Sequence, residues 1–281
     1  MIAFCPHQPP AIFFEERNDL ADFQRHEVRI PCLVKQWPRM TLRAIVPGLV
    51  VVLALHVGAQ EPQTKPQRDV AELYQAAVAG DSQALQELRT LGTEGDAAAQ
   101  YNLGLIYENG PGVPRDYAEA VRWYRKAADQ GLANAQYNLG YIYASGQGVP
   151  QDYGEAMRWY RKAADQGVAS AQYNLGYMYA NGQGVPENYI EAARWFREGA
   201  DRGESRAQYS LGALYAGGHG VPQDFVYAHM WFNLAASRAK GDDEKQYSAA
   251  RDSLAARMTP QEIAEAHKFA REWQPKQSGG N

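Results

Sequence analysis

The chain has 281 residues, a formal net charge of -4 and a sequence pI near 5.9. No excess of lysine and arginine is left to neutralise phosphates, which argues against nucleic acid and anionic membrane surfaces as partners. Both cysteines, Cys5 and Cys32, lie near the N-terminus. The rest of the chain can therefore form neither a disulfide framework nor a thiolate metal site.

The first part of the chain, residues 1–39, carries five prolines and shares no pattern with the other residues. Residues 40–59 have the order of parts typical of a secretory signal peptide, with a short positive start, an apolar run and small residues before Gln60. The run of 14 apolar residues is shorter than the roughly 20 that a membrane-spanning helix needs. We expect cleavage near Ala59, a periplasmic or secreted mature chain, and no stable membrane span.

A signal peptide stands at the start of a chain, so we interpret residues 1–39 as a non-native or disordered extension and expect translation to begin at Met40. The alternative is a true cytoplasmic extension followed by a weak signal anchor. Residues 60–68 are polar, include two prolines, and are predicted to form a disordered linker.

Ordered structure is predicted to start with residues 69–95. Two stretches there have helical composition, Asp69 to Ala79 and Gln83 to Leu91, with Gly80 between them. We interpret them as N-terminal capping helices.

A five-residue sequence, Gln-Tyr-Asn-Leu-Gly, recurs at intervals of 36 residues, beginning at Gln100, Gln136 and Gln172, with a variant at Gln208. The first two 36-residue units are identical at 27 positions. Such self-similarity indicates a tandem array in which each unit packs on its neighbours. The predicted units span residues 96–131, 132–167, 168–203 and 204–240.

Each unit contains two predicted helices. In the second unit, Ala133 to Ala144 places apolar residues on one helical face, and Tyr153 to Gln166 does the same after a Gly-x-Gly turn. Asp152 stands where an N-terminal cap is expected. The fold class is therefore all-α, built from antiparallel helix pairs.

A glycine lies in the middle of the first helix of every unit, as at Gly140, where it costs roughly 0.5 to 1 kcal/mol relative to alanine. We expect this cost to be offset by the close approach of an aromatic ring from the second helix, either Trp159 or Tyr160. The repeated leucines and tryptophans are interpreted as core.

The C-terminal part, residues 241–273, is predicted to form capping helices. Asp242 to Met258 is helical in composition, and Thr259-Pro-Gln-Glu262 is a capping box that starts a last helix. Residues 274–281 are predicted to be a disordered tail.

The unit Ala-x-Ala-Gln-Tyr-Asn-Leu-Gly-Tyr-Ile-Tyr-x-x-Gly-x-Gly-Val-Pro-x-Asp-Tyr, followed by Trp159-Tyr160-Arg161-Lys162-Ala163-Ala164, resembles the Sel-one-like repeat of the tetratricopeptide-like α/α solenoids. The resemblance implies a right-handed superhelical solenoid whose concave face binds other proteins or peptides. Some members of the family resemble β-lactamases in activity, but those carry a cysteine pair in each repeat, which this chain lacks.

Candidate binding residues lie on the face of the first helices that points away from the repeated leucines: Asn102, Asn138, Asn174, Tyr141 and Tyr177. An asparagine row could hydrogen-bond an extended peptide backbone, and tyrosine is a common contact anchor. The alternatives are a solvated face and hydrogen bonds between adjacent repeats.

No catalytic, metal or cofactor site is predicted, and we do not expect an enzyme. The Gly-x-Gly pairs lack the strand and the Lys-Ser or Lys-Thr pair of a phosphate loop, and they are interpreted as turns. Ser237 and Lys240 match one β-lactamase element without the other two. His219 and His229 have no cysteine nearby.

The predicted function is an exported scaffold for a protein or peptide partner; the alternative is a protein that binds or hydrolyses cell-wall fragments or β-lactams.

Overall fold

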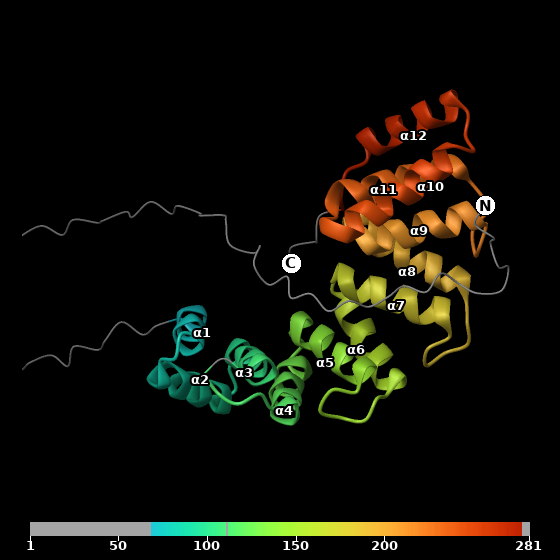
Figure 1. Cartoon of the computed structure of the whole chain (residues 1–281). Coiled ribbons are helices and arrows are strands. Elements are labelled where there is room, and N and C mark those ends of the chain that lie inside the picture. Colours follow the sequence, from blue (N-terminus) through green and yellow to red (C-terminus); the bar gives the residue numbers. More distant parts are fainter. Residues whose placement is uncertain (1–68, 111, 277–281) are drawn as a thin grey trace, which may run out of the picture. The chain divides into compact units, whose positions relative to one another are not determined.

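The computed structural model describes residues 69–110 and 112–276, and the predicted extension, signal peptide and linker lie outside them. The described residues form twelve α-helices and no strand. Two helices precede the repeats, α1 (Val70–Val78) and α2 (Ser82–Glu94), and two come after them, α11 (Gly241–Ala255) and α12 (Pro260–Glu272). The prediction of an all-α fold is confirmed (Figure 1).

Each repeat contributes one helix pair, which we call the A helix and the B helix. The A helices are α3 (Ala97–Asn109), α5 (Ala133–Ser145), α7 (Ala169–Asn181) and α9 (Ser205–Gly217). The B helices are α4 (Tyr117–Asp129), α6 (Tyr153–Asp165), α8 (Tyr189–Asp201) and α10 (Phe225–Arg238). Each helix packs on its predecessor and its successor in the chain, so the pairs stack into a solenoid.

Local signals fix where these helices begin and end. Helix α5 ends at Gly146, whose φ of 74° lies in the left-handed region that only glycine adopts without penalty. Asp152 caps α6, because its side chain accepts a hydrogen bond from the Glu155 amide at 3.0 Å. The Gly-x-Gly pair is thus a turn between two helices, as predicted.

The core runs through the repeats as a succession of apolar layers. The residues that recur in every repeat supply it, and all of them are buried: Leu103, Leu139, Leu175, Leu211, Trp123, Trp159, Trp195 and Trp231. Their interpretation as core is confirmed. No helix in the described part of the chain is long and apolar enough to cross a membrane.

The mid-helix glycines lie against aromatic rings of the B helices. A Cβ added to Gly140 would lie 2.7 Å from Cδ1 of Tyr160, which identifies Tyr160 rather than Trp159 as the partner. The same contact recurs in the other repeats, where Gly104 meets Tyr124, Gly176 meets Phe196 and Gly212 meets Phe232. The absence of a side chain lets the two helices of each pair approach closely.

Buried glutamines join each A helix to the helix before it. Their Nε2 groups donate to backbone carbonyls of that helix at 2.9 to 3.1 Å, in the pairs Gln100 to Gly92, Gln136 to Ala128, Gln172 to Ala164 and Gln208 to Ala200. A second glutamine completes the network in two repeats, where Gln130 donates to Gln100 and Gln166 to Gln136, both at 2.8 Å. These bonds satisfy polar groups that burial would otherwise leave unpaired.

An arginine on each of four helices donates to a tyrosine hydroxyl on the next A helix. The pairs are Arg89 to Tyr107, Arg125 to Tyr143, Arg161 to Tyr179 and Arg197 to Tyr215. All four are 18 residues apart in sequence. We call this set the arginine–tyrosine ladder.

The C-terminal helices close the array. Helix α11 begins 36 residues after α9, so it occupies the position of a fifth A helix, and both α11 and α12 pack on α10. The predicted capping box of α12 is present, because Thr259 and Glu262 bond reciprocally to each other's backbone amides.

The glycine contact can be tested with Gly140→Ala. Alanine is the better helix former by roughly 0.5 to 1 kcal/mol, yet its methyl group would overlap the Tyr160 ring. We expect the overlap to prevail and the free energy of unfolding to fall by about 1 to 3 kcal/mol, measured by urea denaturation.

The matched control is Gly154→Ala in the first turn of α6. Gly154 is exposed, and the equivalent residue of the first repeat is Ala118, so the backbone tolerates alanine there. This variant should be unchanged or slightly more stable, by up to roughly 0.5 kcal/mol. A Gly140→Ala protein as stable as wild type would refute the packing explanation.

Candidate binding surface on the A helices

The five predicted contact residues lie on the A helices, and all are half-buried: Asn102, Asn138, Asn174, Tyr141 and Tyr177. Both tyrosines pack against the apolar layers with part of the ring. At the position of Tyr141, the first repeat has the buried Leu105 and the fourth has Ala213. The tyrosines are therefore neither core residues nor fully solvated.

A second tyrosine series lies beside them. Tyr101, Tyr137, Tyr173 and Tyr209 each face the aromatic ring that covers the glycine of the same repeat, with ring centroids 5.4 to 5.8 Å apart. Tyr173 also contacts Tyr177, at 6.3 Å between centroids. We call eight of these residues the tyrosine–asparagine row: Tyr101, Asn102, Tyr137, Asn138, Tyr141, Tyr173, Asn174 and Tyr177.

Two of the asparagines lie close to aromatic residues of the preceding repeat. Burial raises the pKa of Tyr124 well above its ordinary value, and a hydrogen bond with Asn138 of the following repeat opposes the rise. Asn174 acts in the same way on Tyr160. Such a contact with the preceding repeat is the alternative role considered for the asparagines.

An arginine that sequence reasoning missed lies at one end of the row. The guanidinium of Arg206 lies 4.5 Å from the centre of the Tyr173 ring, and its Nε is 2.7 Å from Glu204. Burial would lower the pKa of Arg206, but the charge of Glu204 and the nearby Tyr137 and Tyr173 outweigh it, so the group stays charged. The earlier repeats carry small residues at this position: Ala98, Asn134 and Ser170.

An acidic residue lies at the other end, in the first repeat. The hydroxyl of Tyr124 donates to Glu108 at 2.5 Å. Burial raises the pKa of Glu108 above its ordinary value, although this bond and Arg115 oppose the rise. The equivalent residues of the other repeats are alanines, so departure from the repeat pattern was the signal that could have revealed both Glu108 and Arg206.

The motifs considered for catalysis do not meet in a site. Ser237 donates its hydroxyl hydrogen to the carbonyl of Leu234 in its own helix, at 2.8 Å. His219 contacts the ring of Tyr189, with centroids 5.3 Å apart. The described residues contain no group of three or more His, Cys, Asp or Glu side chains that could hold a metal ion.

Stacked antiparallel helix pairs with a repeated core define this protein as an α/α repeat scaffold. The model of the Sel1 repeat matches residues 97–132, 133–168, 169–204 and 205–239, so the chain belongs to the Sel1 repeat family. Members of this family are generally protein–protein interaction scaffolds.

One solved structure supports this assignment, and a second shows only a similarity. A Sel1 repeat protein from Oxalobacter formigenes is 34% identical, with a TM-score of 0.58 over 71% of this chain and 83% of that one. A protective antigen of uropathogenic Escherichia coli with an SLR fold is 29% identical, with a TM-score of 0.39 over 73% of this chain and 56% of that one. No curated protein matches the chain.

The half-buried carboxyl group of Glu108 makes stability depend on pH. Its pKa is raised in the folded chain, so ionisation is harder there than in the unfolded chain, and stability falls as pH rises from the unfolded pKa through the folded one. Relative to wild type, Glu108→Gln should therefore gain stability between about pH 4 and about pH 8, measured by urea denaturation.

Glu108→Ala serves as the companion variant, since alanine occupies this position in the other repeats. It also removes the charge but leaves the Tyr124 hydroxyl without this acceptor. The same pH trend in both variants would assign the effect to the charge. A gain that is equal at both pH values would contradict the raised pKa.

Proposed function

We propose that the protein is an exported scaffold that binds an extended segment of a protein partner along the tyrosine–asparagine row. The observation that carries the proposal is the arrangement of this row, whose residues lie on successive A helices and, apart from the buried Tyr173, are half-buried. Half-buried tyrosines offer large contact areas that are already ordered, so their binding costs little conformational entropy.

The chemistry of the row suits a peptide better than a small molecule. Asparagine amides can pair with backbone groups of an extended chain, and the phenol rings offer apolar faces with a polar edge. Arg206, which is paired with Glu204, and Glu108, which accepts from Tyr124, give the two ends of the row different polar chemistry, which would favour one orientation of the bound segment. The role is non-catalytic.

The binding face can be tested with the double variant Tyr141→Ala and Tyr177→Ala. The fourth repeat carries Ala213 at this position, so the helix accepts alanine. With a partner captured from the native source and then purified, we expect binding to weaken by about 1 to 2 kcal/mol or more, as for other aromatic interface anchors, measured by calorimetry.

The matched control is Arg158→Ala with Arg194→Ala on the B helices. Each arginine is exposed and pairs with a glutamate of its own helix, Glu155 or Glu191. Loss of binding in the arginine pair with none in the tyrosine pair would place the partner on the B helices. Circular dichroism must show that both variants keep their helix content.

Export forms the second part of the proposal and rests on the sequence of residues 40–59. We expect the purified native protein to begin near Gln60 and to be recovered outside the cytoplasm, because signal peptidase cleaves after small residues such as those that end at Ala59. N-terminal sequencing measures this directly. An intact chain that starts at Met1 and stays in the cytosol would contradict it.

A further inference from the structure

The fourth repeat and helix α11 after it depart from the pattern of the other repeats at positions that meet in one place. His229 on α10 replaces the apolar residues Val121, Met157 and Ala193. At the next step of the arginine–tyrosine ladder, the donor and the acceptor change sides. Asn233 stands where the other repeats have the donating arginine, and Arg251 stands where they have the accepting tyrosine. Arg251 Nη1 donates to Asn233 Oδ1 at 3.3 Å across the same spacing of 18 residues.

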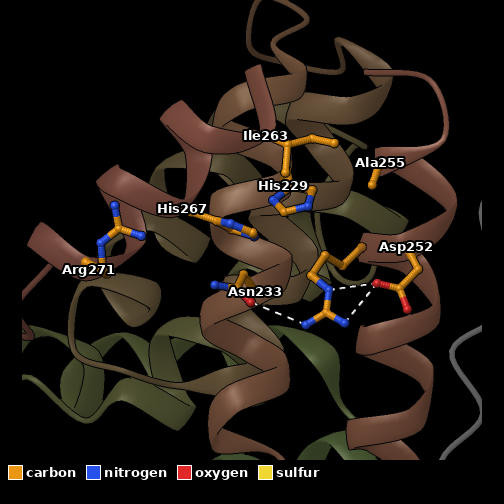
Figure 2. Close-up of a pocket in the computed structure, with 8 residues that line it drawn as sticks. His229, Asn233, Asp252, Ala255, Ile263, His267 and Arg271 are labelled. Atoms are coloured by element: carbon orange, nitrogen blue, oxygen red, sulfur yellow. Dashed lines mark hydrogen bonds and ion pairs between the residues drawn. The ribbon is translucent and has the colours of Figure 1, made fainter. Parts of the chain in front are cut away.

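These residues line a hollow of about 540 Å³ among α10, α11 and α12, shown in Figure 2. Helix α12 adds His267 and Arg271. Ala255 and Ile263 form the apolar wall of the hollow. The hollow is therefore built from residues that the repeat pattern does not require. It lies at the end of the array, apart from the tyrosine–asparagine row.

The charges in the hollow leave one guanidinium in excess. Arg251 is held by Asn233 and by Asp252, whose carboxylate oxygen lies 2.8 Å from Nη2. The negative charge of Asp252 is thus already matched. Arg271 is exposed, and its guanidinium forms no hydrogen bond or ion pair with any other described residue. An anion entering the hollow would meet one fixed and one unpaired guanidinium.

His229 adds an unsatisfied polar group. The side chain is 2% exposed, its Nδ1 has no hydrogen-bond partner in the described part of the chain, and its ring lies 5.2 Å from that of His267. Burial, together with His267 and Arg251, lowers the pKa of His229 to about 4, against the opposing effect of Asp252. The imidazole is neutral at neutral pH and offers hydrogen bonding without adding charge.

We propose that this hollow binds a single carboxylate group of a peptide or protein ligand, with the unpaired guanidinium of Arg271 as its main donor. A guanidinium group presents parallel N–H donors that match the planar carboxylate. One excess positive charge balances one carboxylate, whereas a phosphate dianion would bring one more negative charge than the hollow can balance. The proposal does not depend on what binds the tyrosine–asparagine row.

The carboxylate can come from an acidic side chain or from the C-terminus of a chain, and three probe peptides separate these sources. They are acetyl-Gly-Glu-Ala-amide, acetyl-Gly-Gln-Ala with a free C-terminus, and the neutral acetyl-Gly-Gln-Ala-amide. Each is titrated into the full chain with ¹³C-labelled histidine, and the ring signals of His229 and His267 are followed by NMR. We expect saturable shifts with at least one charged peptide and none with the neutral one.

Arg271→Gln should weaken binding of the charged peptide by about tenfold or more, because it removes the unpaired donor. The matched control is Arg257→Gln, since Arg257 is an exposed arginine of the same region that lies over the Phe225 ring and does not line the hollow. It should titrate like wild type. Three results would overturn the proposal: equal shifts with the neutral peptide, unchanged binding in Arg271→Gln with an unaltered melting temperature, or tighter binding of inorganic phosphate.

Discussion

The contact between a mid-helix glycine and an aromatic ring sets the separation of the two helices in every repeat. Because Tyr160 lies directly on the backbone of Gly140, the A and B helices come closer than two ordinary side chains would permit. At that separation the same ring also meets Tyr137, with ring centroids 5.8 Å apart. One missing side chain thus determines both the packing inside a repeat and part of the candidate surface.

Two sets of polar bonds, the buried glutamine bonds and the arginine–tyrosine ladder, then fix how successive repeats stack. Apolar layers alone tolerate sliding, whereas a buried amide such as that of Gln136 donates to one particular carbonyl, that of Ala128, and is costly to leave unpaired. The glutamine bonds change at the end of the array. Arg238 lies over Trp273 instead of bridging to the last glutamine, and the Oε1 of Gln208 has no hydrogen-bond partner among the described residues.

The sequence was informative wherever a residue acts locally or recurs. The 36-residue period predicted the helix pairs, and turn and cap chemistry located boundaries such as those at Gly146 and Asp152. The sequence could not decide whether Trp159 or Tyr160 packs on Gly140. Both are aromatic and adjacent on the same helix, so the choice depends on how that helix is rotated about its axis. The glutamine bonds and the arginine–tyrosine ladder were missed because their partners lie 8 to 30 residues apart in sequence. The proposed contact residues remain a prediction.

Since every interface between repeats carries the same glutamine-to-carbonyl bond and the same arginine-to-tyrosine bond, the point at which a repeat begins is arbitrary. Cutting out any 36 consecutive residues from the middle of the array would join a B helix to an A helix that carries the same donors and acceptors. Ala128, for example, would receive the amide of Gln172 in place of that of Gln136. Unequal recombination within such a gene could therefore lengthen or shorten the protein without damaging its fold, and the length of the array could evolve separately from the chemistry of its ends.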